Sequence, residues 1–193
     1  MRNGQTNICF SGGAKGSDLA WGDAALAAGH QVIHFSFEGH RTHAPQSTLY
    51  VMSMEELQQA DEHLKVANQS LKRYLPFQKP WIINLLRRNY YQIRDTHSLY
   101  AISSFDKKGQ VNGGTAWAIQ MFFDKLKCEE KKLDEFPIYC YSQVTNFWMQ
   151  LTNQGWIKLP GTPSTPKGLW TGVGTRDLIE SGAFAIKSVF GRP

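Results

Sequence analysis

The sequence lacks the features by which several classes of protein are recognised. Its 193 residues hold no run of about 18 apolar residues, the length that a membrane-spanning helix needs. Residues 1–7 lead toward an apolar strand with no hydrophobic signal region, so we expect no secretory signal and no membrane partner. Only three cysteines occur, Cys9, Cys128 and Cys140, and they are widely spaced. This pattern predicts reduced thiols in the core of a cytoplasmic protein.

Charged residues are also scarce, at 19% of the chain, whereas hydrophobic residues make up 41%. This balance is typical of a globular chain and excludes a disordered one. The formal net charge is +5, and the one dense basic cluster, residues 125–132, is interrupted by Glu129 and Glu130. A scattered positive charge suits an anionic small ligand as well as nucleic acid, and it does not favour nucleic acid.

Strand-like and helix-like patterns alternate along the chain. The residue types and apolar spacings predict strands at 8–10, 31–37, 99–103, 137–141, 147–151, 156–159 and 169–171, and helices at 17–28, 54–75, 81–96, 115–126 and 177–190. We expect Ser17 or Asp18 to cap the first helix, Gly29 to end it, and residues 38–53 to form a loop. The alternation predicts an α/β fold, a three-layer Rossmann-like domain over 1–193 with a mostly parallel sheet.

A glycine-rich stretch follows the first predicted strand. Its polar and glycine residues are Ser11, Gly12, Gly13, Lys15, Gly16, Ser17 and Asp18. A strand that runs through glycines into a helix presents free backbone N–H groups and the positive end of a helix dipole. This arrangement favours an anion, most often a phosphate. The alternative is a tight turn that needs glycine only for its positive φ. The order of residues matches neither a P-loop nor a Gly-x-Gly-x-x-Gly fingerprint.

Two later stretches also place glycines between a predicted strand and a predicted helix. The first comprises Asn112, Gly113, Gly114 and Thr115, and the second is 171–176, with Gly174 and Arg176. Each follows a predicted strand, and ligands of parallel sheets bind at the carboxyl ends of the strands. We therefore expect all three stretches at one ligand, with Arg176 in the first turn of the last helix. The alternative for 171–176 is a simple helix start.

The stretch Ser11–Asp18 resembles the first motif of the SLOG superfamily, which is related to DprA and to the lonely-guy cytokinin-activating enzymes. It looks most like the YspA/YpsA-type branch, which often has Gly-Gly-Ala-Arg-Gly-Ala-Asp at this position. The resemblance continues at Arg88–Asn89 and at Gly113–Gly114–Thr115, and so covers most of 7–127. It implies a Rossmann-like sheet that binds nucleotides or nucleotide-derived ligands, and it leaves a homo-oligomer open.

One departure from that superfamily bears on activity. Lonely-guy enzymes carry Pro-Gly-Gly-x-Gly-Thr-x-x-Glu, whose glutamate is catalytic, but this chain has no proline before its glycines and no carboxylate after them. Gln120 on the following helix cannot act as a general base. The phosphoribohydrolase activity is therefore not implied. Asp18 and Glu38, on neighbouring loops, are the carboxylates that could take the role.

The loop after the second predicted strand carries His40, Arg41 and His43. A zinc site is not expected here, because no cysteine pair lies near. Two interpretations stay open, a lid that contacts the phosphate or base of a ligand and a solvated polar loop.

These patterns lead us to expect a binder of a nucleotide-derived ligand, such as an ADP-ribose-type signal, that acts as a sensor or sequestering protein. In this hypothesis the backbone of the first two glycine stretches holds phosphate, and Lys15, Arg88 and Arg176 supply charge. Asp18 and Asn112 fix ribose or base. We expect no metal and no further cofactor. The alternative is a nucleotide-metabolising enzyme, an N-glycosidic hydrolase or transferase that uses Asp18 or Glu38. A DNA-binding role of the DprA kind comes third.

Overall fold

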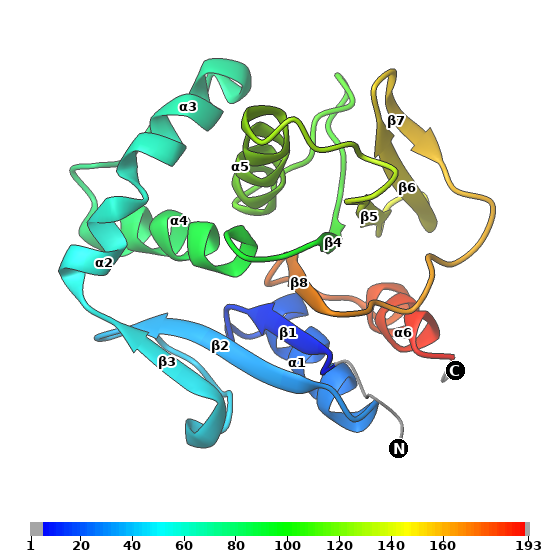
Figure 1. The fold of residues 1–193 in the computed structure, drawn as a ribbon, viewed down its shortest axis with the longest axis horizontal. Coiled ribbons are helices and arrows are strands. Elements are labelled where there is room, and N and C mark those ends of the chain that lie inside the picture. The colour runs from blue at the N-terminus through cyan, green and yellow to red at the C-terminus, as the bar shows by residue number, and fades with distance from the viewer. Residues whose placement is uncertain (1–5, 192–193) are drawn as a thin grey trace.

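The computed structural model describes residues 6–191, and these form an α/β fold with one eight-stranded sheet in the order β3-β2-β1-β8-β4-β5-β6-β7 (Figure 1). The strands are β1 (Ile8–Ser11), β2 (Gln31–Phe37), β3 (Leu49–Met52), β4 (Ser98–Ser103), β5 (Ile138–Ser142), β6 (Phe147–Thr152), β7 (Gly155–Lys158) and β8 (Leu169–Gly174). Strands β3, β2, β1, β8, β4 and β5 are parallel to one another, whereas the edge hairpin β6–β7 is antiparallel, because β6 pairs antiparallel with both β5 and β7. The predicted α/β class and mostly parallel sheet are confirmed.

Helices pack on both faces of this sheet. On one face lie α1 (Ser17–Ala27) and α6 (Glu180–Val189), and on the other α2 (Met54–Gln59), α3 (Asp61–Leu71), α4 (Pro80–Ile93) and α5 (Thr115–Cys128) (Figure 1). Strand β4 shows why both faces are covered, because its alternate residues enter different cores. Leu99 and Ala101 pack with α3–α5, whereas Tyr100 and Ile102 pack with α1 and α6.

Strand β8 occupies the centre of the sheet although it comes last in the chain. It pairs with β1 through Phe10 and Thr171, and with β4 through Tyr100 and Gly172. From β1 the sheet grows through β2 to β3, and from β4 it grows in the opposite direction through β5 to β7. The strand order therefore reverses around β8, and the crevice at the carboxyl ends of strands at such a point is where ligands of α/β sheets bind.

The structure corrects the prediction at 38–53, which is not a loop throughout. It contains a short 3₁₀ turn, η1 (Gln46–Thr48), and the edge strand β3, which pairs with β2. Tyr50 and Val51 of β3 are exposed. The four residues of this edge strand are all apolar, so they show no apolar–polar alternation and the sequence pattern did not reveal the strand.

The predicted helix 54–75 is in fact two helices, α2 and α3, separated at Ala60. A capping box of Ser53 and Glu56 starts the first, and a left-handed Lys72 ends the second. The predicted helix 81–96 is α4, which starts at Pro80 and ends at Ile93.

The third glycine stretch also differs from its prediction. Gly172 and Gly174 belong to β8, and α6 begins at Glu180 and not at residue 177. A Cβ on Gly172 would overlap the indole of Trp21, which is fully buried where α1 packs on the sheet. Gly172 therefore allows the helix to approach β8. Arg176 lies in the loop between β8 and α6 and not in a helix turn.

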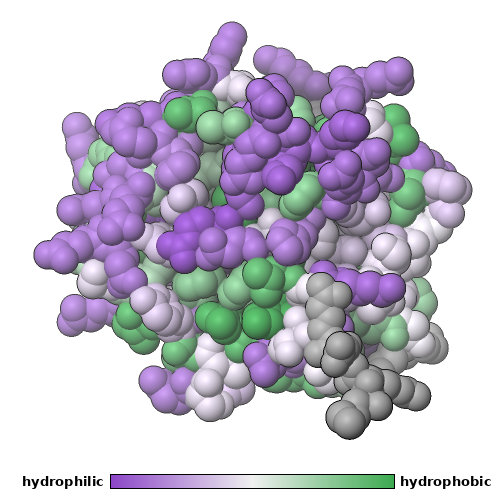
Figure 2. Space-filling view, viewed as in Figure 1, coloured by the Kyte–Doolittle hydropathy of each residue, from purple (hydrophilic) through white to green (hydrophobic). Residues whose placement is uncertain are grey.

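Two further findings concern the surface and the thiols. Within 6–191 no helix is long and apolar enough to cross a membrane, and hydrophilic side chains cover most of the upper half of the face in Figure 2. All three cysteines are free. Cys9 and Cys140 are buried as predicted, but the prediction is wrong for Cys128, which is exposed at the end of α5.

Candidate functional site

Residues from all three glycine stretches line one cavity of about 370 Å³ at the carboxyl ends of β1, β8 and β4. We call it the first cavity. The residues that were predicted as ligand contacts and that line it are Lys15, Asp18, Arg88, Asn112, Gly113, Gly114, Thr115, Gly174 and Arg176. The structure thus brings together, at the point where the strand order reverses, segments that are 160 residues apart in the sequence (Lys15 to Thr175).

The other predicted site residues are not part of the lining of the first cavity. Ser11 is buried, and its hydroxyl lies 2.8 and 2.7 Å from the carbonyl oxygens of Asp18 and Gly172. Ser17 donates to the carbonyl of Thr175 at 2.8 Å. Neither hydroxyl caps α1, whose N-cap residue is Gly16 at φ 98°, so the predicted cap at Ser17 or Asp18 is wrong. Glu38 follows β2 as an exposed residue and is not among those that line the first cavity.

The first glycine turn leaves backbone donors unused. Its carbonyls are occupied, since Gly12 accepts from Arg88, Gly13 from Thr42 and Ala14 from the amide of Leu19. Within residues 6–191, the amides of Ala14 and Lys15 have no hydrogen-bond acceptor, and both residues line the first cavity. Exposed N–H groups of this kind in a glycine turn form an anion-binding concavity.

The second glycine turn, residues 112–115, also lines the first cavity with backbone amides that have no acceptor in residues 6–191. Its carbonyls are held by side chains, since Arg73 donates to Gly113 at 2.9 Å and Asn89 donates to Gly114 at 3.2 Å. In the described part of the chain the amides of Gly113, Gly114 and Thr115 have no acceptor, and they stand at the N-terminus of α5. The free amides of the turn before α1 and those at the N-terminus of α5 therefore belong to residues that line one cavity.

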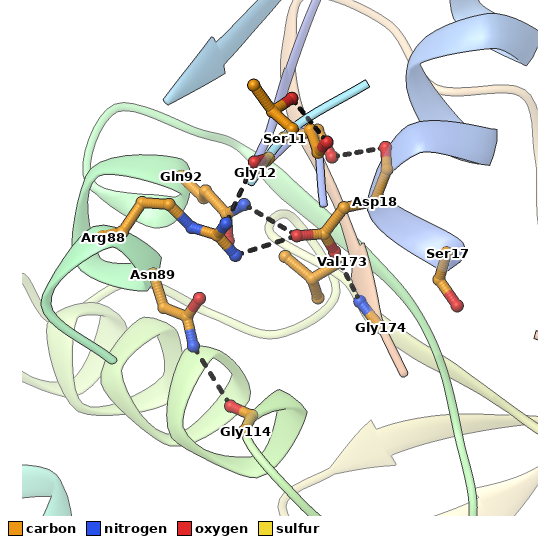
Figure 3. Close-up of polar contacts among 12 residues, drawn as sticks. Ser11, Gly12, Ser17, Asp18, Arg88, Asn89, Gln92, Gly114, Val173 and Gly174 are labelled. Atoms are coloured by element: carbon orange, nitrogen blue, oxygen red, sulfur yellow. Dashed lines mark hydrogen bonds and ion pairs between the residues drawn. The ribbon is translucent and has the colours of Figure 1, made fainter. Parts of the chain in front are cut away.

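The side chain of Arg88 contacts three separate parts of the site. Arg88 is 5% exposed, and its guanidinium lies 3.0 Å from the carboxylate of Asp18 and 2.9 Å from the carbonyl of Gly12 (Figure 3). A Cβ on Gly12 would overlap both charged groups, so only glycine lets the turn pass so close to them. Arg88 thus ties α4 to the first glycine turn and to the start of α1.

Asp18 is engaged through both carboxylate oxygens. One accepts from the backbone N–H of Gly174 at 3.0 Å, and the other accepts from Arg88, with the amide of Gln92 at 3.5 Å (Figure 3). Burial raises the pKa of the Asp18 carboxyl, and the guanidinium of Arg88 opposes that rise. The Asp18 carboxylate thus links α1 to β8 and α4, and so fixes these elements relative to one another.

His40 extends the same set of contacts to the loop after β2. Its Nε2 lies 3.0 Å from a guanidinium nitrogen of Arg88 and its Nδ1 lies 3.0 Å from the hydroxyl of Ser36. Burial and the positive charges of Arg88 and Arg176 lower the pKa of His40 to about 3. The ring is therefore neutral at pH 7 and accepts from Arg88 through Nε2, so Nδ1 carries the proton.

Asn112 is a predicted ligand contact that also has a partner within the protein. It lines the first cavity, but its side-chain amide donates to the hydroxyl of Ser104 at 2.9 Å, so one of its groups already has a partner in the protein.

Several residues of the site have no counterpart among the sequence predictions. Arg73 and Gln92 contact it only through the tertiary fold, and no local pattern marks them. Ile82, Leu85 and Leu86 form its apolar wall. Their helical spacing on α4 was visible in the sequence, but the same spacing equally indicates a core-facing stripe.

Comparison with protein-family models, with curated proteins and with solved structures gives no match. The resemblance to the SLOG superfamily therefore rests only on the two glycine motifs and Arg88–Asn89, and these comparisons do not test it.

Proposed function

We propose that this chain binds a nucleotide or nucleotide-derived ligand in the first cavity, as a sensor or sequestering protein with a Rossmann-like sheet. One observation carries the proposal: two glycine turns with unused backbone amides, together with the loop of Arg176, face one cavity where the strand order reverses. Phosphate is the group that such donors recognise.

The charges of the cavity support an anionic ligand. Lys15 and Arg176 are exposed side chains that line it, and neither forms an ion pair within residues 6–191. The negative charge of Asp18 is compensated by Arg88. The cavity therefore carries an excess of positive charge at its mouth.

The opposite wall suits the uncharged part of a nucleotide. Ile82, Leu85 and Leu86 supply an apolar surface, and the polar groups of Ser104 and Asn112 lie near it in the lining. A pocket with a mainly apolar wall and a few polar groups is the usual setting for a ribose and a base.

Binding is favoured over glycosidic catalysis by the state of the carboxylates. Asp18 is the one carboxylate in the lining of the first cavity, and both of its oxygens already accept hydrogen bonds. Glycoside hydrolysis ordinarily takes two carboxylates, one of them free to move a proton. The enzyme alternative keeps one supporting observation, the raised pKa of Asp18, which is typical of general acids.

Calorimetric titration with AMP, ADP and ADP-ribose tests the proposal. We expect saturable binding of at least one of them, weakened about tenfold or more by Lys15→Gln and by Arg176→Gln, because each removes a charge-assisted hydrogen bond. Lys65→Gln, which removes an equal charge on α3, is the control. No binding at millimolar ligand would overturn the proposal. Mass spectrometry of the mixtures separates the alternatives, since turnover that releases free base and is abolished by Asp18→Asn would establish an enzyme.

A further inference from the structure

A second cavity of about 620 Å³ lies beside the first. Its own wall comes from Trp81 at the start of α4 and from the loop after β2, with Gly39, His40, Arg41 and His43. The two cavities share Ala14, Lys15 and Arg176. A molecule bound at these three residues therefore has room on both sides of them.

The wall of the second cavity is fixed to the first glycine turn. Thr42 donates to the carbonyl of Gly13 at 2.7 Å and accepts from the amide of Ala44 at 3.1 Å. His40 contacts Arg88, which in turn holds Gly12. These contacts hold the loop against the first glycine turn, so hydrogen bonds fix this wall of the second cavity in place.

The charges place the anionic part of a ligand between the cavities. Lys15 and Arg176 lie on the shared wall, and the second cavity adds Arg41 with no carboxylate in its lining. The neutral ring of His40 adds no charge. A ligand that spans both cavities therefore has its negative charge at Lys15 and Arg176. Its end in the second cavity has Arg41 as a hydrogen-bond donor.

Trp81 provides a surface for a ring. Trp81 is 40% exposed and lines the second cavity. Its ring makes a T-shaped contact with Phe37 at 5.5 Å between ring centres, and the ring of His40 lies at 6.2 Å. Phe37 is buried and holds the indole from one side. An indole that packs on a buried ring and is open to a cavity is a platform on which bases stack.

We propose that the ligand has two ring-bearing ends joined by a diphosphate, with the diphosphate at Lys15 and Arg176 and the second ring on Trp81 beside Arg41. This inference rests on the proposed function and names its ligand class, a dinucleotide or a nucleoside diphosphate that carries a second ring. Volumes of about 370 and 620 Å³ each lie within the range of small-molecule pockets, about 300–1,000 Å³.

The test compares ADP with P1,P2-di(adenosine-5′) diphosphate, which adds a second nucleoside to the same diphosphate. We expect the dinucleotide to bind at least about tenfold more tightly, because stacking of one more base contributes on that scale. Trp81→Leu and Arg41→Gln are expected to weaken dinucleotide binding more than ADP binding. Lys65→Gln is the matched charge control, and thermal melting of each variant checks the fold.

Tryptophan fluorescence gives a second readout that a structural role of Trp81 would not produce. The dinucleotide should quench the emission more than ADP does, and Trp81→Leu should remove that difference. If ADP binds but the second nucleoside adds neither affinity nor quenching, the inference is wrong and the proposed function stands. If neither probe binds, the inference is wrong, and the proposed function is overturned as well when AMP and ADP-ribose also fail to bind.

Discussion

Two regions of the same crevice hold charged side chains in different environments, one buried and paired, the other exposed. Asp18 and Arg88 are buried, 7% and 6% exposed at their side chains, and they satisfy each other and the backbone of two strand ends. Lys15 and Arg176 are exposed and form no ion pair among the described residues. The first pair positions the turns, whereas the second pair is available to a ligand.

The difference follows from what burial does to a charge. A buried ion pair offers little net stability over an apolar pair, but removing one partner leaves an uncompensated charge and costs several kcal/mol. An exposed cation costs almost nothing to remove. Mutations in the two regions should therefore separate stability from binding.

The largest effect is expected at the buried pair. Arg88→Met leaves the Asp18 carboxylate buried without its counter-ion, so we expect a loss of about 3–5 kcal/mol in the free energy of unfolding. Arg87→Met is the matched control, because Arg87 pairs with the more exposed Asp61, and it should cost less. Urea denaturation measures both.

A double-mutant cycle sharpens this prediction. Adding Asp18→Asn to Arg88→Met removes the uncompensated charge. The double variant should therefore lose less free energy of unfolding than the sum of the losses of the two single variants. Additive losses would show that the two groups do not act as a pair.

An intermediate effect is expected from pH through His40, which contacts Arg88. Its pKa is lowered from its ordinary value to about 3, with burial the largest cause, so the folded protein favours the neutral ring. The stability that this gives is present above about pH 6.5 and is lost as the pH falls toward 3. The ring is only half-buried, so we expect a loss of less than about 1.4 kcal/mol per pH unit.

Unfolding of the wild type and of His40→Gln between pH 7 and pH 5 measures the contribution. Glutamine keeps an acceptor for Arg88 but does not titrate, so its stability should fall less on acidification. The neighbouring His34, whose pKa is lowered to about 4, titrates in both proteins and cancels in the comparison. Equal slopes would mean that His40 does not contribute.

The sequence predicted the parts of this crevice that depend on local pattern. The unit β1–α1–β2 and the hairpin β6–β7 follow from alternation, glycines and helical spacing, and the structure confirms them. The glycine turns were found because a strand, glycines and a helix stand next to one another in the sequence. That they line one cavity followed from the rule for parallel sheets.

What escaped prediction depends on contacts between distant residues. Asp18 and Arg88 are 70 positions apart, so no local pattern could show that Arg88 is a buried ion-pair partner of Asp18. Gly172 was interpreted as part of a turn, but it is a strand residue whose missing Cβ makes room for Trp21, 151 positions earlier. Such a role becomes visible only when the helix is placed on the sheet.

The smallest change in stability is expected at the exposed pair. Lys15→Gln and Arg176→Gln should each shift the free energy of unfolding by no more than about 0.5 kcal/mol, because neither cation has an ion-pair partner in residues 6–191 to lose. Removing one of two nearby positive charges also relieves their repulsion, which offsets part of any lost packing. Urea denaturation without ligand measures the shift, and the same variants should show the loss of ADP binding expected above. A loss of more than 1 kcal/mol would place these cations with the structural pair.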